Sequence, residues 1–383
     1  MRVIASFVGG WGHAEPLLPL AGWARDLGHE VTFAGQAAVV PRLAALGYGV
    51  DVVGPDTLAT EALPLAPVDR DAERTVMRDH FVAHFGASRA QALTGLFRRE
   101  RPGLVVCDEV DVGAVVAAER LGIPCVTVDV IAAGMLTAPA VVGDAWGDLR
   151  RSNGLAADPD CSRIGGSLVV APLPRSLRDP RARPSDRFRF VRPPILDEVA
   201  AGPAGDGARP LVYVTLGTVF NLESGDLFER LARAMASVVA THDVDVLPTT
   251  GPGIEAGTLP PVPSAVRVEP FVPQREVLAR CAAVMCHGGS GTLVAALSLG
   301  IPVVTLPMGA DQPDNADRCR DLGVGPTLDP LTATPAEIAA ATTDALRDPA
   351  TRQAARELAA EAAAQPRVAD LPDLQRALVR GGR

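Results

Sequence analysis

Residues 281–302 read CAAVMCHGGSGTLVAALSLGIP, in which a short apolar run, a glycine-rich turn and a helical segment follow one another directly. The run ends at Cys286, and a helix is expected over 293–299 because Gly300 and then Pro302 terminate it. A strand, a glycine turn and a helix start in this order present the first N–H groups of the helix and the positive end of its dipole. The stretch therefore predicts a site for a phosphate or diphosphate.

Other glycine-rich sites fit this turn less well. A Walker loop requires a lysine, and the chain contains none. A dinucleotide fingerprint is G-x-G-x-x-G in the first unit of a domain, and a hydrolase elbow needs a second glycine where Thr292 stands. Taken alone, the turn would also suit a tight strand–helix connection that binds no ligand.

Two flanking segments complete a pattern. FVPQ occupies 271–274 and PMGADQ occupies 307–312. Together with HGGSGT they resemble the donor-binding signature of family 1 glycosyltransferases of the GT-B fold, especially bacterial enzymes that glycosylate natural products. The resemblance implies that FVPQ holds the nucleotide base, HGGSGT the diphosphate, and the Asp-Gln pair the sugar hydroxyls. The residues expected on this basis to bind the nucleotide sugar are Phe271, Val272, Pro273, Gln274, His287, Gly288, Gly289, Ser290, Gly291, Thr292, Asp311 and Gln312. Gly217 and Thr218, at the end of another strand, are expected to add a hydrogen-bond donor to the phosphate or sugar.

Length, charge and cysteine pattern limit the classes of protein to which the chain can belong. The length of 383 residues predicts two domains, and the net charge of −9 argues against a nucleic-acid surface. No apolar run is long enough to span a bilayer, and the chain enters its first strand at once, so neither membrane insertion nor a signal peptide is expected. Six cysteines without a C-x-x-C pair indicate reduced thiols in a cytoplasmic protein, with no metal site.

Strand and helix patterns alternate in both halves of the chain, which predicts an α/β fold with parallel sheets. The resemblance makes this a GT-B-like fold of two facing, doubly wound Rossmann-like domains with a cleft between them. The expected parts are an acceptor-binding domain at 1–195, a linker at 196–210, a nucleotide-sugar-binding domain at 211–365, and a final helix at 366–383 that crosses back to the first domain. Residues 130–190 read as irregular.

The loop GGWGH follows the first strand and places His13 at the mouth of a helix, whose dipole is expected to keep the imidazole neutral. The segment resembles the family motif whose histidine is the catalytic base that deprotonates the acceptor hydroxyl. A carboxylate normally fixes the tautomer of such a base. Asp108 occupies the family's position for it, and Asp111 in the same DEVD loop is the alternative.

A long helical stretch at 69–100 carries Met77 and Phe81 on one face, together with His80 and His84 at a spacing that also suits zinc. No third ligand is evident nearby, so a face lining the cleft is preferred. The acceptor-binding residues expected are Trp11, Met77, Phe81 and His84.

Family members that use uridine donors commonly carry a glutamate eight residues after the turn histidine, where this chain has Ala295. This difference favours a dTDP-sugar. The sequence thus predicts an inverting glycosyltransferase that needs no metal or cofactor and acts on a hydroxyl of a small apolar natural product such as a polyketide or macrolide. The alternatives are a UDP-sugar-using transferase, a sugar-nucleotide epimerase on the same fold, and an inactive sugar-nucleotide-binding partner. Nucleic acid and membrane partners are not expected, and a homodimer is left open.

Overall fold

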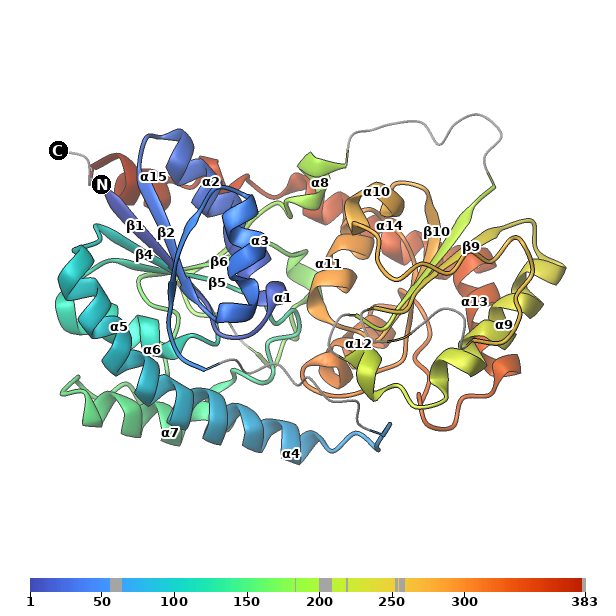
Figure 1. Cartoon of the computed structure of the whole chain (residues 1–383), viewed down its shortest axis with the longest axis horizontal. Helices are drawn as coiled ribbons and strands as arrows, with labels where there is room; N and C mark the ends of the chain where they lie inside the picture. The colour runs from blue at the N-terminus through green and yellow to red at the C-terminus, as the bar shows by residue number, and fades with distance from the viewer. Residues whose placement is uncertain are drawn as a thin grey trace.

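The computed structural model describes residues 1–55, 64–182, 184–199, 209–217, 220–251, 254 and 259–380. Most of the linker expected at 196–210, and also Thr218, lie outside these ranges. Within them the chain forms two parallel α/β halves that lie side by side (Figure 1).

The first half is built on a seven-stranded sheet with the order β3-β2-β1-β4-β5-β6-β7, and every pairing is parallel. Neighbouring residues of one strand enter different apolar clusters, since Val105 packs on one face of the sheet and Val106 on the other. A parallel sheet that helices cover on both faces must place apolar side chains on both of those faces. The strands are β1 (Arg2–Ser6), β2 (Glu30–Gly35), β3 (Gly49–Val52), β4 (Leu104–Asp108), β5 (Cys125–Val128), β6 (Leu168–Ala171) and β7 (Phe188–Phe190).

The helical stretch expected at 69–100 is present, but its middle is wound as a ten-residue π-helix, Val76–Phe85, between two α-helices. The Asp69 carboxylate accepts hydrogen bonds from the main-chain N–H groups of Asp71 and Ala72 and so caps the first of them. The helices of this half are α1 (Trp11–Ala14), η1 (Glu15–Leu17), α2 (Leu18–Asp26), η2 (Ala37–Val39), α3 (Val40–Ala45), α4 (Arg70–Thr75), the π-helix, α5 (Gly86–Glu100), α6 (Val112–Leu121), α7 (Pro139–Ser152), η4 (Arg175–Leu177) and α8 (Ile195–Glu198).

The expectation that residues 130–190 are irregular is wrong. They contain α7 and the two strands β6 and β7. The buried apolar residues of α7 are spaced as one helical face, Val142, Ala145, Trp146 and Leu149. Two glycines inside the helix lower its intrinsic propensity and hide this pattern.

The second half has a four-stranded parallel sheet with the order β11-β10-β8-β9. Its strands also bury both faces, because Val212 and Tyr213 enter different apolar clusters. The elements are β8 (Leu211–Thr215), η5 (Phe220–Glu223), α9 (Leu227–Thr241), β9 (Asp245–Thr249), α10 (Gln274–Leu278), β10 (Cys281–Cys286), α11 (Ser290–Ser298), β11 (Val303–Thr305), α12 (Gln312–Asp321), α13 (Pro335–Arg347) and α14 (Pro349–Ala364).

The last helix, α15 (Pro372–Arg380), leaves the second half and packs on the first, where Figure 1 shows it beside α2. Leu374 and Leu378 are fully buried in the same apolar cluster as Leu20 of α2. His29 Nε2 bonds to the carbonyl oxygen of Leu378 at 2.9 Å. The end of the chain therefore completes the core of its beginning.

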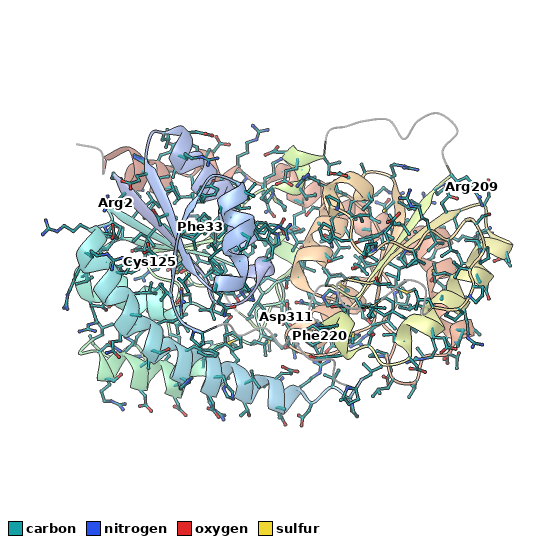
Figure 2. The ribbon with its side chains drawn as sticks, in the orientation of Figure 1. Arg2, Phe33, Cys125, Arg209, Phe220 and Asp311 are labelled. Carbon is teal, nitrogen blue, oxygen red and sulfur yellow. The ribbon has the colours of Figure 1, made fainter. Side chains whose placement is uncertain are left out.

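Polar contacts join the two halves along their common boundary. Arg70 at the start of α4 pairs with Asp314 at 2.9 Å and with Asp317 at 2.7 Å on α12. Figure 2 shows Asp311 and Phe220 at the same boundary.

Every helix in the described ranges is too short or too polar to cross a bilayer.

Candidate active site

A histidine–carboxylate pair lies at the carboxyl edge of the first sheet. Strands β1 and β4 are neighbours, so the loop after β1 and the last residue of β4 meet at this edge. His13 Nδ1 lies 2.7 Å from Asp108 Oδ2. The Asp108 side chain is fully buried, whereas 31% of the His13 side chain is exposed. The buried carboxylate therefore fixes a ring that solvent or a ligand can reach.

The structure distinguishes Asp108 from the alternative, Asp111. The Asp111 carboxylate accepts two hydrogen bonds from the guanidinium of Arg89, at 2.9 and 2.6 Å, and one from the hydroxyl of Ser6 at 2.6 Å. It also caps the start of α6 through the N–H of Ala114. Since this carboxylate is fully occupied inside the core, Asp108 is the aspartate that contacts His13.

The expectation that a helix dipole keeps His13 neutral is wrong. Burial lowers the pKa of His13. The hydrogen bond and charge of Asp108, together with the charge of Asp311, raise the pKa by more than burial lowers it, so the pKa lies above its ordinary value. Helices α1, η1 and α2 follow one another without a break over 11–26, so His13 lies in the first turn of this helical run. The raised pKa shows that the carboxylates near His13 outweigh the effects that favour a neutral imidazole.

The glycine turn of the second half has the predicted geometry. Strand β10 ends at Cys286, and α11 begins at Ser290 with Gly289 as its N-cap. Gly288 has φ +88°, and a Cβ there would stand 3.3 Å from the carbonyl oxygen of Gln312, so the backbone approach needs glycine. The N-terminus of α11 is therefore free of a side-chain cap and able to receive an anion.

His287 sits beneath this turn with its Nδ1 buried and without a partner in the described residues. Gly217 gives it room, because a Cβ there would stand 2.8 Å from the imidazole. Burial lowers the pKa of His287 to about 4, although a main-chain hydrogen bond with Thr215 opposes the shift. The ring is therefore neutral near pH 7 and can meet a phosphate through hydrogen bonding rather than through charge.

Asp311 is held by a network that also spans the boundary. Its Oδ2 accepts hydrogen bonds from the Ser290 hydroxyl at 2.5 Å and from Asn315 Nδ2 at 2.7 Å. The first half contributes two main-chain N–H groups, since Ala132 donates to Ser290 Oγ at 2.7 Å and Ala133 donates to Asn315 Oδ1 at 2.9 Å. Ser290 thus orients Asp311 in this structure, and its expected role toward a phosphate stays a prediction.

Asn315 was missed at the sequence level. It lies four residues after Asp311 on α12, a spacing that places both side chains on one helix face. Gln312, which was expected to bind sugar, is almost fully buried, and its Oε1 accepts the main-chain N–H of Met308 at 2.8 Å. Its expected contact with a sugar stays a prediction.

The segment expected to hold a nucleotide base offers an exposed ring. Phe271 is 53% exposed, which is high for a large apolar side chain. Gln274 begins α10 and donates through Nε2 to the hydroxyl of Thr292 at 2.9 Å, which joins this segment to α11. The predicted base and diphosphate segments are therefore adjacent.

The residues expected on the acceptor side are placed differently from one another. Trp11 is half-buried, and the guanidinium carbon of Arg42 lies 3.6 Å from the centre of the Trp11 ring. Met77 is buried in the first-half core and Phe81 packs partly against it, whereas His84 is exposed and lies against Phe85. The structure thus groups Met77 and Phe81 but does not bring His84 or Trp11 to them.

No cluster of three or more His, Cys, Asp or Glu suited to a metal ion occurs in the described ranges.

The comparisons with known proteins agree with this geometry. Residues 232–377 match the family described as erythromycin biosynthesis protein CIII-like, C-terminal domain. The chain is 30% identical to elloramycin glycosyltransferase ElmGT of Streptomyces olivaceus, over 97% of this chain and 96% of that one. It is 29% identical to L-demethylnoviosyl transferase of Streptomyces niveus, over 96% and 95% of the two chains.

The fold is shared with solved glycosyltransferases. The crystal structure of glycosyltransferase VinC in complex with DTDP superposes with a TM-score of 0.75 at 24% identity, covering 99% of this chain and all of that one. Whole-length similarity of sequence and fold, together with the donor signature, leads to one conclusion. The chain is a glycosyltransferase of family 1, with the GT-B fold, and belongs with the enzymes that glycosylate antibiotics and related natural products.

Proposed function

We propose that this enzyme transfers a sugar from a dTDP-sugar to a hydroxyl of a small, largely apolar natural product of polyketide or macrolide type, with inversion at the anomeric carbon and without a metal ion. The observation that carries the proposal is the pair of His13 and Asp108, with Nδ1 and Oδ2 2.7 Å apart. The charge of Asp311, held on the other half of the chain, also acts on His13. A histidine of the first half and a carboxylate of the second half thus influence each other across the boundary, which supports roles for them as base and sugar ligand.

The base works through the free nitrogen of its ring. Nδ1 of His13 donates to Asp108, which leaves Nε2 as the acceptor, and Nε2 has no partner in the described part of the chain. Nε2 takes the proton of the acceptor hydroxyl as its oxygen attacks the anomeric carbon. Asp108 stabilises the imidazolium that forms, as a buried carboxylate does in a catalytic triad.

The leaving group is a nucleoside diphosphate, and its β-phosphate gains negative charge as the glycosidic bond breaks. The uncapped N-terminus of α11 supplies N–H donors and a positive dipole where that charge develops. His287 adds a neutral donor at the same turn. One displacement step, with the acceptor attacking opposite the leaving diphosphate, inverts the configuration.

Two observations support a thymidine donor. VinC, which shares the fold, was crystallised with DTDP. In this chain Ala295 stands on α11 where a glutamate would grip both ribose hydroxyls of a uridine nucleotide. A 2′-deoxyribose, which lacks the 2′-hydroxyl, therefore loses no hydrogen bond at this position.

The direct test is acceptor-dependent release of dTDP. Panels of natural-product alcohols and dTDP-sugars are incubated with the enzyme, and the anomeric configuration of the product is read from its NMR coupling constant. We expect dTDP release only with acceptor, inverted product, and unchanged turnover in EDTA. Retention of configuration or loss of turnover in EDTA would overturn the corresponding part of the proposal.

The pH dependence follows from the raised pKa of His13. The base acts only when neutral, so kcat/KM should fall as the pH drops through a value above 6.5. Asp108→Asn removes the charge that raises this pKa, and the acid limb of the profile should move to lower pH. The measurement is kcat/KM from pH 5 to 9 for both proteins, and an unchanged limb in the variant would contradict the assignment.

The donor preference depends on Ala295. Calorimetry should show that dTDP binds at least as tightly as UDP, and Ala295→Glu should shift the balance toward UDP because a carboxylate pairs with both ribose hydroxyls. A charged hydrogen bond is worth about 1.5–3 kcal/mol, which sets the scale of the shift. A clear preference for UDP in the unmodified enzyme would mean that another residue contacts the ribose.

A further inference from the structure

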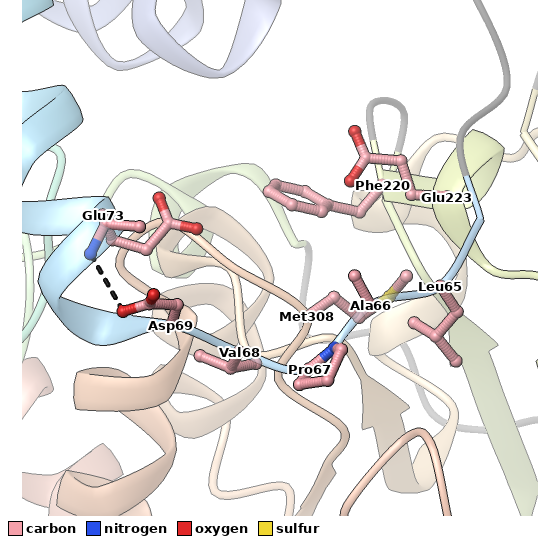
Figure 3. A pocket seen from close by; sticks show the side chains of 10 residues that line it. Leu65, Ala66, Pro67, Val68, Asp69, Glu73, Phe220, Glu223 and Met308 are labelled. Carbon is pink, nitrogen blue, oxygen red and sulfur yellow. Dashed lines mark hydrogen bonds between the residues drawn. The ribbon is translucent and has the colours of Figure 1, made fainter.

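A cavity of about 240 Å³ lies on the boundary between the halves, beside the candidate active site (Figure 3). The first half contributes residues 65–69 and the start of α4, and the second half contributes η5 and Met308. The apolar side chains of its wall are those of Leu65, Pro67, Val68, Met308 and the ring of Phe220. Three carboxylates also line it, those of Asp69, Glu73 and Glu223, and the carboxylate of Asp69 accepts the main-chain N–H groups that begin α4.

Glu73 comes from the first half and Glu223 from the second, and the charge of Glu73 acts on Glu223. Burial raises the pKa of Glu73, and burial together with the charge of Glu73 raises the pKa of Glu223. A main-chain hydrogen bond from Ala310 lowers the pKa of Glu73 in part, so this carboxylate lies against the residue before Asp311. In Figure 3 the ring of Phe220 lies between Glu73 and the carboxylate of Glu223.

Among the described residues neither Glu73 nor Glu223 forms a salt bridge, whereas Asp314 and Asp317 on the same boundary both pair with Arg70. The undescribed residues 56–63 and 218–219, which adjoin the cavity-lining segments in sequence, contain no lysine, arginine or histidine, and the cationic residues outside the described ranges are Arg183 and Arg383. Two half-buried acids without a counter-charge repel each other, so a ligand that brings a positive charge is favoured there.

The aromatic ring narrows the kind of cation. A Cβ on Gly309 would stand 2.8 Å from Glu73 Oε1 and 3.0 Å from a ring carbon of Phe220, so carboxylate and ring converge over this glycine. A phenyl ring attracts an organic ammonium through its face but offers no ligand to a metal ion. The combination of acids, ring and apolar wall suits an alkylammonium group.

We propose that this cavity binds a protonated amino group on the transferred sugar, so that the preferred donor is a nucleotide-linked aminodeoxysugar. The inference rests on the proposed function and names the class of its sugar. The sugar, rather than the acceptor, carries the amine because the cavity adjoins the diphosphate turn and Asp311. Phe220 lies 6.3 Å from the His287 ring, centre to centre, and Glu73 contacts Ala310.

The test is calorimetric titration with dTDP, dTDP-6-deoxyglucose, and its 3-amino and 4-amino analogues. At least one amino sugar should bind roughly 10- to 100-fold more tightly than the neutral sugar, as expected for a charge-assisted contact. Glu73→Gln and Glu223→Gln should each remove most of this preference and leave dTDP affinity unchanged. Glutamine keeps an acceptor for the Ala310 N–H, so the local backbone is preserved.

Glu357→Gln on α14 is the matched control, because that glutamate is exposed and contacts only Gln353 among the described residues. Normal dTDP binding by each variant shows that it is folded. If dTDP binds but neither amino sugar is preferred, or if the preference survives in both cavity variants, the inference is overturned. If dTDP itself fails to bind, the thymidine part of the proposed function fails, and the same comparison with UDP-linked sugars decides the amine question separately.

Discussion

Replacing His13 by alanine is expected to lower kcat by a factor of roughly 10² to 10⁴, which is the usual contribution of general-base catalysis. The dissociation constant for dTDP should remain nearly unchanged, because His13 belongs to the first half and the diphosphate turn to the second. The measurement pairs steady-state turnover of an ordinary alcohol acceptor with dTDP calorimetry. An alcohol is needed because a strongly acidic acceptor ionises without help and would mask the loss.

His80→Ala is the matched control for this substitution. His80 is an exposed histidine of the same half and is not among the expected site residues, so its loss should leave turnover close to normal. Near-normal turnover in the His13 variant with an alcohol acceptor would remove His13 from the role of base. Equal losses in kcat and in dTDP affinity would indicate a misfolded protein rather than a missing base.

Replacing Asp111 by asparagine is expected to lower the free energy of unfolding of the first half by about 3–5 kcal/mol, the cost of leaving one partner of a buried ion pair unpaired. Asp111 is fully buried and Arg89 is 4% exposed, so water cannot take over the guanidinium. Intrinsic fluorescence in a urea titration reports on this half, because Trp11, Trp23 and Trp146 all lie within it.

The control is Asp79→Asn, which removes a carboxylate from an exposed pair with Arg78 on the same half. Surface pairs contribute little, so its unfolding transition should coincide with that of the unmodified protein. A transition at the normal urea concentration in the Asp111 variant would show that Arg89 finds another acceptor. Asp108 and Asp111 are three residues apart, yet one is expected to affect catalysis and the other stability.

The alternation of strands and helices was predictable because parallel strands that are buried on both faces read as apolar runs, as LVVC before Asp108 does. The family was predictable because three short segments around the diphosphate turn each carry their own chemistry. The choice between Asp108 and Asp111 could not be predicted from the sequence. Arg89, the buried residue that pairs with Asp111, comes from a helix and lies 22 residues earlier in the chain. Helix α7 was hidden by its glycines, and the contacts of Ala132 and Ala133 involve main-chain N–H groups, which every residue possesses.

The position of α15 has a consequence for how the protein is made. Leu371, Leu374 and Leu378 cover part of the apolar surface that β1 and α2 expose on one face of the first sheet. During synthesis the first half leaves the ribosome early, but this surface stays open until the final helix emerges. The strands and helices of the second half, from β8 to α14, also precede α15 in the chain and leave the ribosome before it. Chaperones that bind exposed apolar surface therefore have a defined target on the nascent chain, on the side of the first sheet that α15 later covers.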